Sequence, residues 1–447
     1  MQPGHKHTAP LTHRLSRLAS APADHRKLPP EVVLRAKHSI ADWFACAIAG
    51  AAHEDAEIQR AFALQRAAEG PCTVIGETRR VGATTAALAN GFSGHVLDWD
   101  DVNLECNVHA TAAVLPALWA LAEERGATGA ALIDAFIAGI DATCLLGRVA
   151  GTKHYDTGWH ASSVLGIIGA AAACTALAGL NQRRANTSLQ LAFAQASGAQ
   201  AVFGTAAKPL QIARAAEGGL QAALLAEAGL SGRMDGLDGA RGLAHLYSFE
   251  FGLYEVESKD ALSGTLIKVH ASCFGTQAPL DALAELQSQG LNSDSLGSLE
   301  VRLAPHTARV CSIKQPSSGT EIKFSTAHLC AMRLAGLDTG TPDAFTDAIA
   351  KDAPLRALAR RIAVIPSEGL GTGETELRAR LADGTELSCR LDRGIPESDL
   401  EAQGRRVQRK YLALASPSLG EAKSRALFEA LMRIEQVPNV RDVLSAQ

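Results

Sequence analysis

From about residue 28 to residue 230, apolar positions recur with the three- and four-residue spacing of buried or amphipathic helices. Glycines such as Gly126, Gly151 and Gly179 follow several of these runs, as glycines commonly do after a last helical turn. The predicted helices cover residues 31–50, 82–97, 110–125, 129–150, 161–180, 184–198 and 210–230. The pattern therefore predicts a large all-α domain.

After about residue 265 the pattern changes. Three short runs alternate apolar and polar residues, as half-buried strands do: residues 299–303, 377–381 and 387–391. Asp383-Gly384 lies between the last two and predicts a β-hairpin. Helical spacing returns in residues 326–335, 342–358 and 398–447. We predict a mainly α protein with an all-α domain at residues 1–266, completed by 401–447, and a smaller α+β lid domain at 267–400.

Residues 161–180 contain no charge, and their length alone would allow a membrane span. Their many Ala, Gly, Ser and Thr residues make the segment only weakly apolar, and it lacks flanking aromatic and Lys/Arg signals. We therefore expect a helix buried on all sides and no membrane partner.

Composition narrows the function classes. The chain has 447 residues and a net charge of −4, with acids and bases interspersed, so we expect no nucleic-acid partner. Its nine cysteines form no C-x-x-C pair, which argues against a zinc knuckle or a thioredoxin-like site. An odd number of scattered cysteines fits a reducing compartment and predicts a cytoplasmic protein.

The segment from residue 95 to 109 places four carboxylates and two imidazoles in fifteen residues. Crowded ionisable groups in an apolar chain indicate a site with tuned pKa values. Asp98 to Asp101 also spell D-x-D-D, which terpene-handling helical enzymes use as an acid or, in a related form, to hold Mg²⁺. An aromatic content of 4 % argues against that chemistry. A solvated acidic helix end is the alternative without function.

Three further motifs carry candidate chemistry. His160 opens the uncharged helix, where the positive end of the helix favours neutral imidazole. Pro209 in a first helical turn leaves Lys208 at the mouth of the next helix, where it could receive a carboxylate. Lys268 and Cys273 lie at the predicted domain junction, and such clefts often bind ligands. In the alternative without function, His160 is a capping or core histidine and Lys208 is a surface cation. Lys268 and Cys273 are then linker residues.

In this order and spacing, the four motifs resemble the MmgE/PrpD family. The resemblance implies an all-α domain with an α+β lid, a homodimer, and an active site between the domains that works without metal or organic cofactor. It puts Asp98, His109, His160, Lys208 and Cys273 on active-site positions. The further residues expected to contact substrate are Asp101, Arg214, Lys268, His270, Gln277 and His328.

The resemblance implies a cofactor-independent lyase, a dehydratase or decarboxylase, acting on a small di- or tricarboxylate such as 2-methylcitrate or cis-aconitate. The chain departs from the family pattern at Val102, Ala110, Gln211, Ala213 and Gln277, which leaves the particular reaction open. The alternatives are an isomerase or epimerase of a small dicarboxylate, a metal-dependent terpene-type enzyme, and a helical dimer without activity. We expect Lys208→Ala to abolish turnover and to change thermal stability little.

Overall fold

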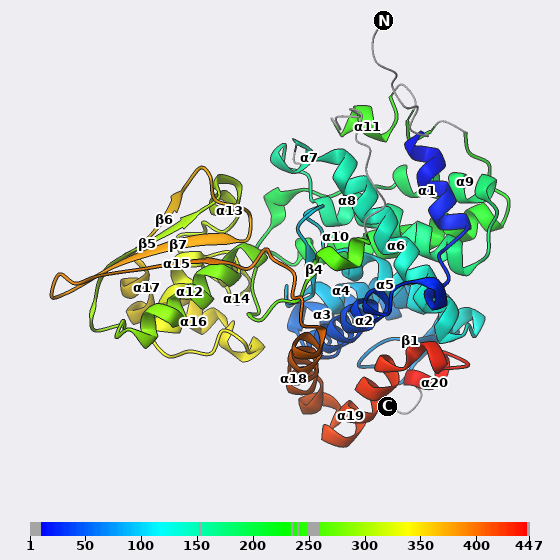
Figure 1. The fold of residues 1–447 in the computed structure, drawn as a ribbon. Coiled ribbons are helices and arrows are strands. Elements are labelled where there is room, and N and C mark those ends of the chain that lie inside the picture. The colour runs from blue at the N-terminus through cyan, green and yellow to red at the C-terminus, as the bar shows by residue number, and fades with distance from the viewer. Residues whose placement is uncertain (1–9, 152, 234–235, 239–240, 248–259, 445–447) are drawn as a thin grey trace, which may run out of the picture.

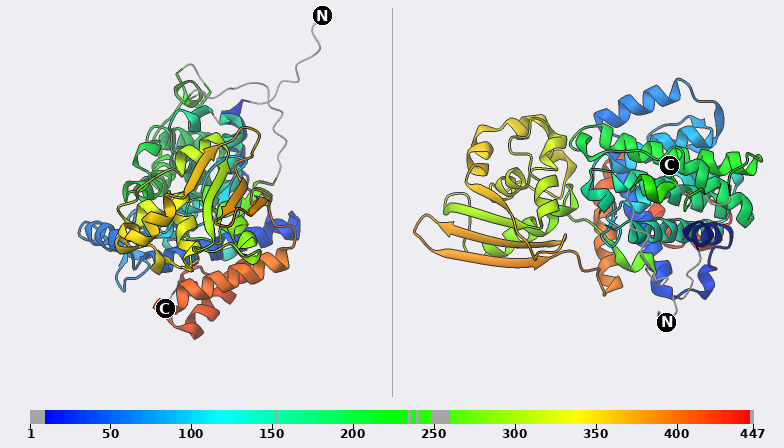
Figure 2. Two further views of the ribbon diagram at one scale, coloured as in Figure 1. Left: turned by 90° about the vertical axis from the view of Figure 1, so that its left-hand side faces the viewer. Right: turned by 90° about the horizontal axis from the view of Figure 1, so that it is seen from above.

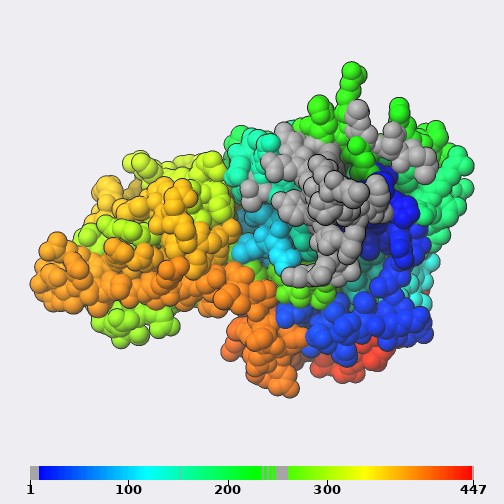
Figure 3. Space-filling view, turned by 45° about the horizontal axis from the view of Figure 1, so that its top comes forward, coloured from blue at the N-terminus to red at the C-terminus, as the bar shows by residue number. Residues whose placement is uncertain are grey.

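The computed structural model describes residues 10–151, 153–233, 236–238, 241–247 and 260–444. The chain forms a large helical domain and a smaller lid that contains a sheet (Figure 1). In the space-filling view the lid is a separate lobe beside the helical domain (Figure 3). The predicted mainly α fold with an α+β lid is confirmed.

Eleven helices of the described residues belong to the helical domain before the lid. They are α1 (Leu11–Ser20), α2 (Pro30–Gly50), α3 (Glu54–Leu64), α4 (Ala83–His95), α5 (Ala110–Arg125), α6 (Gly129–Ala150), α7 (Lys153–Asp156), α8 (Ala161–Leu177), α9 (Gln182–Phe193), α10 (Ala207–Glu227) and α11 (Leu243–Leu246). Two small antiparallel pairs accompany them: β1 (Glu69–Thr73) with β2 (Arg80–Val81), and β3 (Val102–Asn103) with β4 (Thr265–Leu266).

Helix α8 lies at the centre of this domain and packs against α5, α6, α9 and α10. Its first fifteen residues are all buried, so the prediction of a buried helix is confirmed. Small residues allow the close approach: a Cβ at Gly169 would lie 1.8 Å from Thr143 Oγ1 of α6. Among the described residues, α6 is long and apolar enough to cross a membrane, and 78 % of its most apolar window is buried in the protein.

The lid is a four-stranded sheet in the order β6-β5-β7-β8. β5 (Leu296–Leu303) pairs parallel with β6 (Ile362–Pro366) and antiparallel with β7 (Glu374–Leu381), which forms a hairpin with β8 (Glu386–Asp392). The turn contains Asp383-Gly384 as predicted, with Gly384 at φ +89°. The helices gather on one side of the sheet (Figure 2). They are α12 (Gln277–Ser288), α13 (Pro305–Val310), α14 (Gly319–Ile322), α15 (Thr326–Leu334), α16 (Asp347–Lys351) and α17 (Ala353–Ala359).

Two features of the lid differ from the sequence prediction. The single helix expected at 342–358 is broken at Asp352, because Pro354 has no N–H to continue the helix and Asp352 instead caps α17 by accepting from Leu355 N. β6 was not predicted, since its apolar residues show no alternation.

The chain then returns to the helical domain. α18 (Leu400–Leu419) and α19 (Glu421–Met432) both pack against α2, and α20 (Arg441–Leu444) follows. Lys410 of α18 donates from Nζ to Asp42 Oδ1 at 2.7 Å and to the carbonyl of Trp99 at 2.6 Å. The last helices therefore hold the loop that carries the acidic motif.

Candidate active site

Three helix N-termini bring the predicted site residues together. His109 is the N-cap of α5, His160 is the N-cap of α8, and Lys208 lies in the first turn of α10. All three side chains line one cavity between the helical domain and the lid. Helix N-termini carry partial positive charge, so this convergence favours an anionic ligand.

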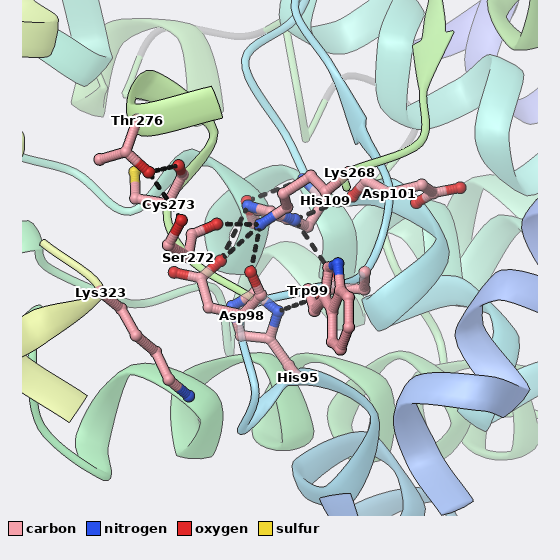
Figure 4. A network of polar contacts seen from close by, with 12 residues as sticks. His95, Asp98, Trp99, Asp101, His109, Lys268, Ser272, Cys273, Thr276 and Lys323 are labelled. Carbon is pink, nitrogen blue, oxygen red and sulfur yellow. Dashed lines mark hydrogen bonds and ion pairs between the residues drawn. The ribbon is translucent and has the colours of Figure 1, made fainter. Parts of the chain in front are cut away.

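Asp98 is the centre of the charge network (Figure 4). Its carboxylate lies 2.8 Å from Lys208 Nζ and 2.7 Å from Lys268 Nζ, which also donates to the Asp98 carbonyl at 2.6 Å. Burial alone would raise the pKa of Asp98, but the two ammonium groups hold that pKa well below its ordinary value. Asp98 takes a left-handed φ of +51°, which is costly for a residue with a Cβ and is maintained by these contacts.

His95 positions Lys208. Its Nδ1 donates to Asp100 Oδ1 at 2.9 Å, which leaves Nε2 to accept from Lys208 Nζ at 2.9 Å. Burial lowers the pKa of His95 to about 4, so the ring is neutral and fits this accepting role. Sequence reasoning gave neither His95 nor Asp100 a role, although both lie in the acidic segment that it singled out.

His109 stands between carboxylates and the cavity. Its Nδ1 lies 2.8 Å from the Asp101 carbonyl and 3.0 Å from Asp100 Oδ2, so this nitrogen carries a hydrogen. Its Nε2 lies 3.8 Å from Asp98 Oδ1. An imidazolium formed here during turnover would be stabilised by both carboxylates.

His160 is oriented by Gln211. The side-chain amide of Gln211 donates to the Ala199 carbonyl at 3.3 Å, so its Oε1 faces His160 and accepts from Nδ1 at 2.6 Å. Burial first, and Lys208 next, hold the pKa of His160 well below its ordinary value. A neutral ring with its hydrogen on Nδ1 has a free lone pair on Nε2, which is the arrangement of a general base.

Besides Lys268, the lid contributes thiols, rings and a second lysine. A hydrogen bond from Cys311 lowers the pKa of half-buried Cys273 and raises that of Cys311 itself. Lys323 donates from Nζ to the Val96 carbonyl at 2.9 Å, across the domain interface, and burial lowers its pKa to about 8. Sequence reasoning missed Cys311 and Lys323, because neither lies in a motif that shows chemistry by spacing alone.

The cavity has a volume of about 60 Å³. At about 30 Å³ for each water molecule, that is room for about two water molecules. Its walls are formed by Val102, Leu104, Asn107, His109, Tyr155, His160, Ser162, Phe203, Lys208, Cys273, Phe274, Gly275, His306, Thr307, Val310, Cys311, Phe324 and Thr372.

Two residues expected to bind substrate lie elsewhere. Arg214 is 65 % exposed and pairs with Glu217 at 2.5 Å, because it lies on the outward face of α10, well beyond the first turn that holds Lys208. His328 forms a hydrogen bond through Nε2 with the Ile349 carbonyl at 3.1 Å and lines a different cavity of the lid. Both positions correct the sequence expectation.

His270 and Gln277 have structural contacts instead. The His270 ring lies between Asp281 Oδ1 at 3.2 Å and Thr339 Oγ1 at 2.8 Å. Gln277 Oε1 accepts from the backbone N–H groups of Val269 and His270 and so fixes the chain crossing into the lid. Neither lines the cavity of Lys208, which corrects a second pair of expected substrate contacts.

Asp101 and Lys268 lie behind the cavity wall. Asp101 accepts from Thr111 Oγ1 at 2.8 Å, and burial, aided by Asp42, raises its pKa to about 7. Lys268 is completely buried against Asp98. Neither side chain is among those that line the cavity of Lys208.

The donor set does not fit a metal ion. Ligand atoms of His95, Asp98, Asp100 and His109 lie within 4.8 Å of one another. However, the ammonium groups of Lys208 and Lys268 already occupy both oxygens of Asp98, and a dication there would face two cations at close range.

Comparison with known proteins identifies the family. Residues 17–253 match the MmgE/PrpD N-terminal domain, and residues 270–435 match the MmgE/PrpD C-terminal domain. The chain belongs to the MmgE/PrpD family. It is 26 % identical to a cis-aconitate decarboxylase of Aspergillus terreus over 98 % of this chain and 95 % of that protein. It is 31 % identical to a cis-aconitate decarboxylase-like protein of Aspergillus oryzae over 58 % of each, and 32 % identical to the cis-aconitate decarboxylase of Homo sapiens over 49 % of this chain and 47 % of that protein.

Proposed function

We propose that the chain is a cofactor-independent lyase that removes CO₂ or water from a small di- or tricarboxylate. The observation that carries the proposal is the grouping of Lys208, His109 and His160 around one small cavity, with Asp98 fixed behind them. The likeness to cis-aconitate decarboxylases makes decarboxylation the first reaction to test.

In a decarboxylation, a retained carboxylate binds at Lys208. The bond between carbon and the departing carboxylate breaks, CO₂ leaves, and the electron pair moves into the unsaturated chain toward the retained carboxylate. Lys208 and the helix N-termini oppose this charge, and an imidazolium then gives a proton to carbon. His109 suits the donor role because Asp98 and Asp100 stabilise its cation.

In a dehydration, His160 would instead take a proton from carbon while hydroxide leaves. A second candidate, an isomerase or epimerase, uses both rings: one removes a proton and the other returns it. The observation that favours this candidate is that His109 and His160 line the same cavity. Deuterium uptake from D₂O without change of composition would identify it.

The terpene-type alternative loses support on two counts. Both oxygens of Asp98 are paired with lysines, and the carboxylate of Asp100 contacts His95 and His109, so neither is free to hold Mg²⁺. The proposal keeps the homodimer and the cytoplasmic location as predictions. Light scattering of the purified chain tests the first of these.

The test is a substrate panel. Purified chain, with and without EDTA, is given cis-aconitate, 2-methylcitrate and smaller unsaturated dicarboxylates, and CO₂, alkene absorbance and chirality are followed. Turnover that EDTA leaves unchanged is expected. Failure with every compound would overturn the proposal, and loss of turnover with EDTA would overturn its cofactor-independent form.

A further inference from the structure

The charged groups of the cavity all lie on one side. Lys208 is the only lysine or arginine among the described residues that line it, and it comes from the helical domain. The imidazoles of His109 and His160 and the three helix N-termini lie on the same side. A ligand carboxylate is therefore held from the helical half.

The lid side is uncharged and largely apolar. It presents Phe274, Val310 and Phe324, together with the thiols of Cys273 and Cys311. The one titratable ring from the lid is His306, whose Nε2 lies 3.1–3.2 Å from the hydroxyls of Thr372 and Thr307. Burial lowers the pKa of His306, so this ring adds no positive charge. None of the described lid residues in the wall is a lysine or an arginine.

The buried charges leave only a small positive excess. Three lysines, Lys208, Lys268 and Lys323, face the ionised carboxylates of Asp98 and Asp100. Asp42 is paired with Lys410, and Asp101, whose pKa is about 7, removes part of the remaining positive charge near neutral pH. Three helix ends add partial charges of up to about one half each. The positive potential therefore matches about two carboxylates. A third would be buried without a partner, which is strongly unfavourable.

We propose that the substrate carries two carboxylates, and that an apolar substituent faces the lid where a tricarboxylate has its third acid group. This inference rests on the proposed lyase function and specifies its substrate class. A fitting compound is 3-methylglutaconate, which has a methyl group in place of the central carboxylate of cis-aconitate.

The reaction balances without a further reagent. The bond from C4 to its carboxylate breaks and CO₂ leaves. The electron pair forms a double bond from C4 to C3, and the former double-bond pair takes up one proton at C2. The dianion and one proton thus give CO₂ and the monoanion 3-methylbut-3-enoate. The proton comes from solvent through an imidazole of the site.

Two matched pairs of compounds test the inference. Turnover of the full chain is compared for cis-aconitate and the 3-methylglutaconate isomer of the same geometry. Binding is compared by calorimetry for the unreactive propane-1,2,3-tricarboxylate and 3-methylglutarate. We expect the methyl compound to be preferred at least about ten-fold in kcat/KM and in Kd.

Preference for the tricarboxylate in either pair overturns the inference and leaves the lyase proposal standing. If neither alkene reacts while 3-methylglutarate binds the more tightly, the lyase proposal fails and the charge preference of the cavity is supported. If neither saturated compound binds, the inference is overturned by that result as well.

Two variants at position 310 test whether a cation in the lid wall shifts the preference toward a tricarboxylate. Val310 is half-buried in the lid wall, so a longer polar side chain can be accommodated there. Val310→Arg should raise the ratio of tricarboxylate to dicarboxylate affinity at least about ten-fold, whereas Val310→Gln should leave it unchanged. An unchanged ratio in folded Val310→Arg contradicts the inference. The wild-type comparison remains decisive if this variant does not fold.

Discussion

The two halves of the cavity differ in how their polar groups are satisfied. In the helical half, Asp98, Lys208 and His95 form a buried, mutually paired set that exists before any ligand binds. In the lid half, the wall is made mainly of rings, thiols and small side chains, and Lys268 and Lys323 of the lid donate to backbone carbonyls of the helical domain. We therefore propose that the acid–base groups are assembled in the helical domain and that the lid covers them and limits the shape of the ligand.

The largest effect is expected from Lys208→Ala. It removes the one lysine or arginine among the described wall residues and one partner of buried Asp98, so kcat/KM should fall at least about 10³-fold. Breaking a buried ion pair should also lower the free energy of unfolding by about 3 kcal/mol. Steady-state kinetics and urea unfolding measure both. This prediction differs from the sequence expectation of unchanged stability, and a fully active variant would contradict the assignment of the helical half.

His160→Asn is expected to lower kcat about 10²- to 10³-fold, because it removes the free Nε2 lone pair. Gln211→Glu is the companion variant. A carboxylate beside Nδ1 would raise the pKa of His160, so the base form appears at higher pH and the acidic limb of kcat/KM moves upward. A pH–rate profile checks both, and an unshifted limb in Gln211→Glu would contradict the role given to this pair.

Asp101→Asn tests the pH dependence of the helical half. Folding raises the pKa of Asp101 to about 7, so the native state binds this proton more tightly than the unfolded chain does. The resulting stability is complete below about pH 4 and is lost as pH rises through about 7, by on the order of 4 kcal/mol. Urea unfolding across this range should show wild type losing stability relative to Asp101→Asn. Parallel curves would refute the raised pKa.

Cys273→Ala probes the lid half. A thiol is a weak hydrogen-bond donor. Among the described residues, no acid or base of the helical half forms a hydrogen bond with Cys273. We therefore expect kcat to fall only about ten-fold or less. Cys273→Ser is the matched control that keeps a donor. A loss in Cys273→Ala as large as that of Lys208→Ala would show that the lid carries essential chemistry and would break the comparison.

The smallest effect is expected from Arg214→Ala. Its side chain is exposed and pairs only with Glu217 among the described contacts, so kcat/KM and the free energy of unfolding should stay within error of wild type. The sequence analysis predicts the opposite, a loss of substrate affinity. The KM of this variant therefore decides between sequence and structure at this position.

The order and spacing of the motifs predicted the site residues better than the chemistry of any single residue did. The helix starts that hold His109, His160 and Lys208 could be predicted, because apolar spacing and Pro209 mark them. The orientation of Arg214 could not, since a helix face is settled only by packing. His95 lies in the acidic segment that the sequence singles out, but sequence reasoning assigned it no role. That role depends on contact with a lysine 113 positions away.

The change of periodicity near residue 265 predicted that a region with strands follows the helices, whereas β6 and the break at Asp352 were not predicted. β6 pairs with a strand about sixty residues earlier, and no local pattern records that pairing. The break depends on a capping contact that competes with an otherwise helical run.

The most direct test of the account is a crystal structure of the chain with 3-methylglutarate. The account predicts one carboxylate within hydrogen-bond distance of Lys208 Nζ, between His109 and His160, and the methyl group against Phe324 and Val310. A ligand bound outside this cavity, or one whose methyl group faces the lysine, would contradict it.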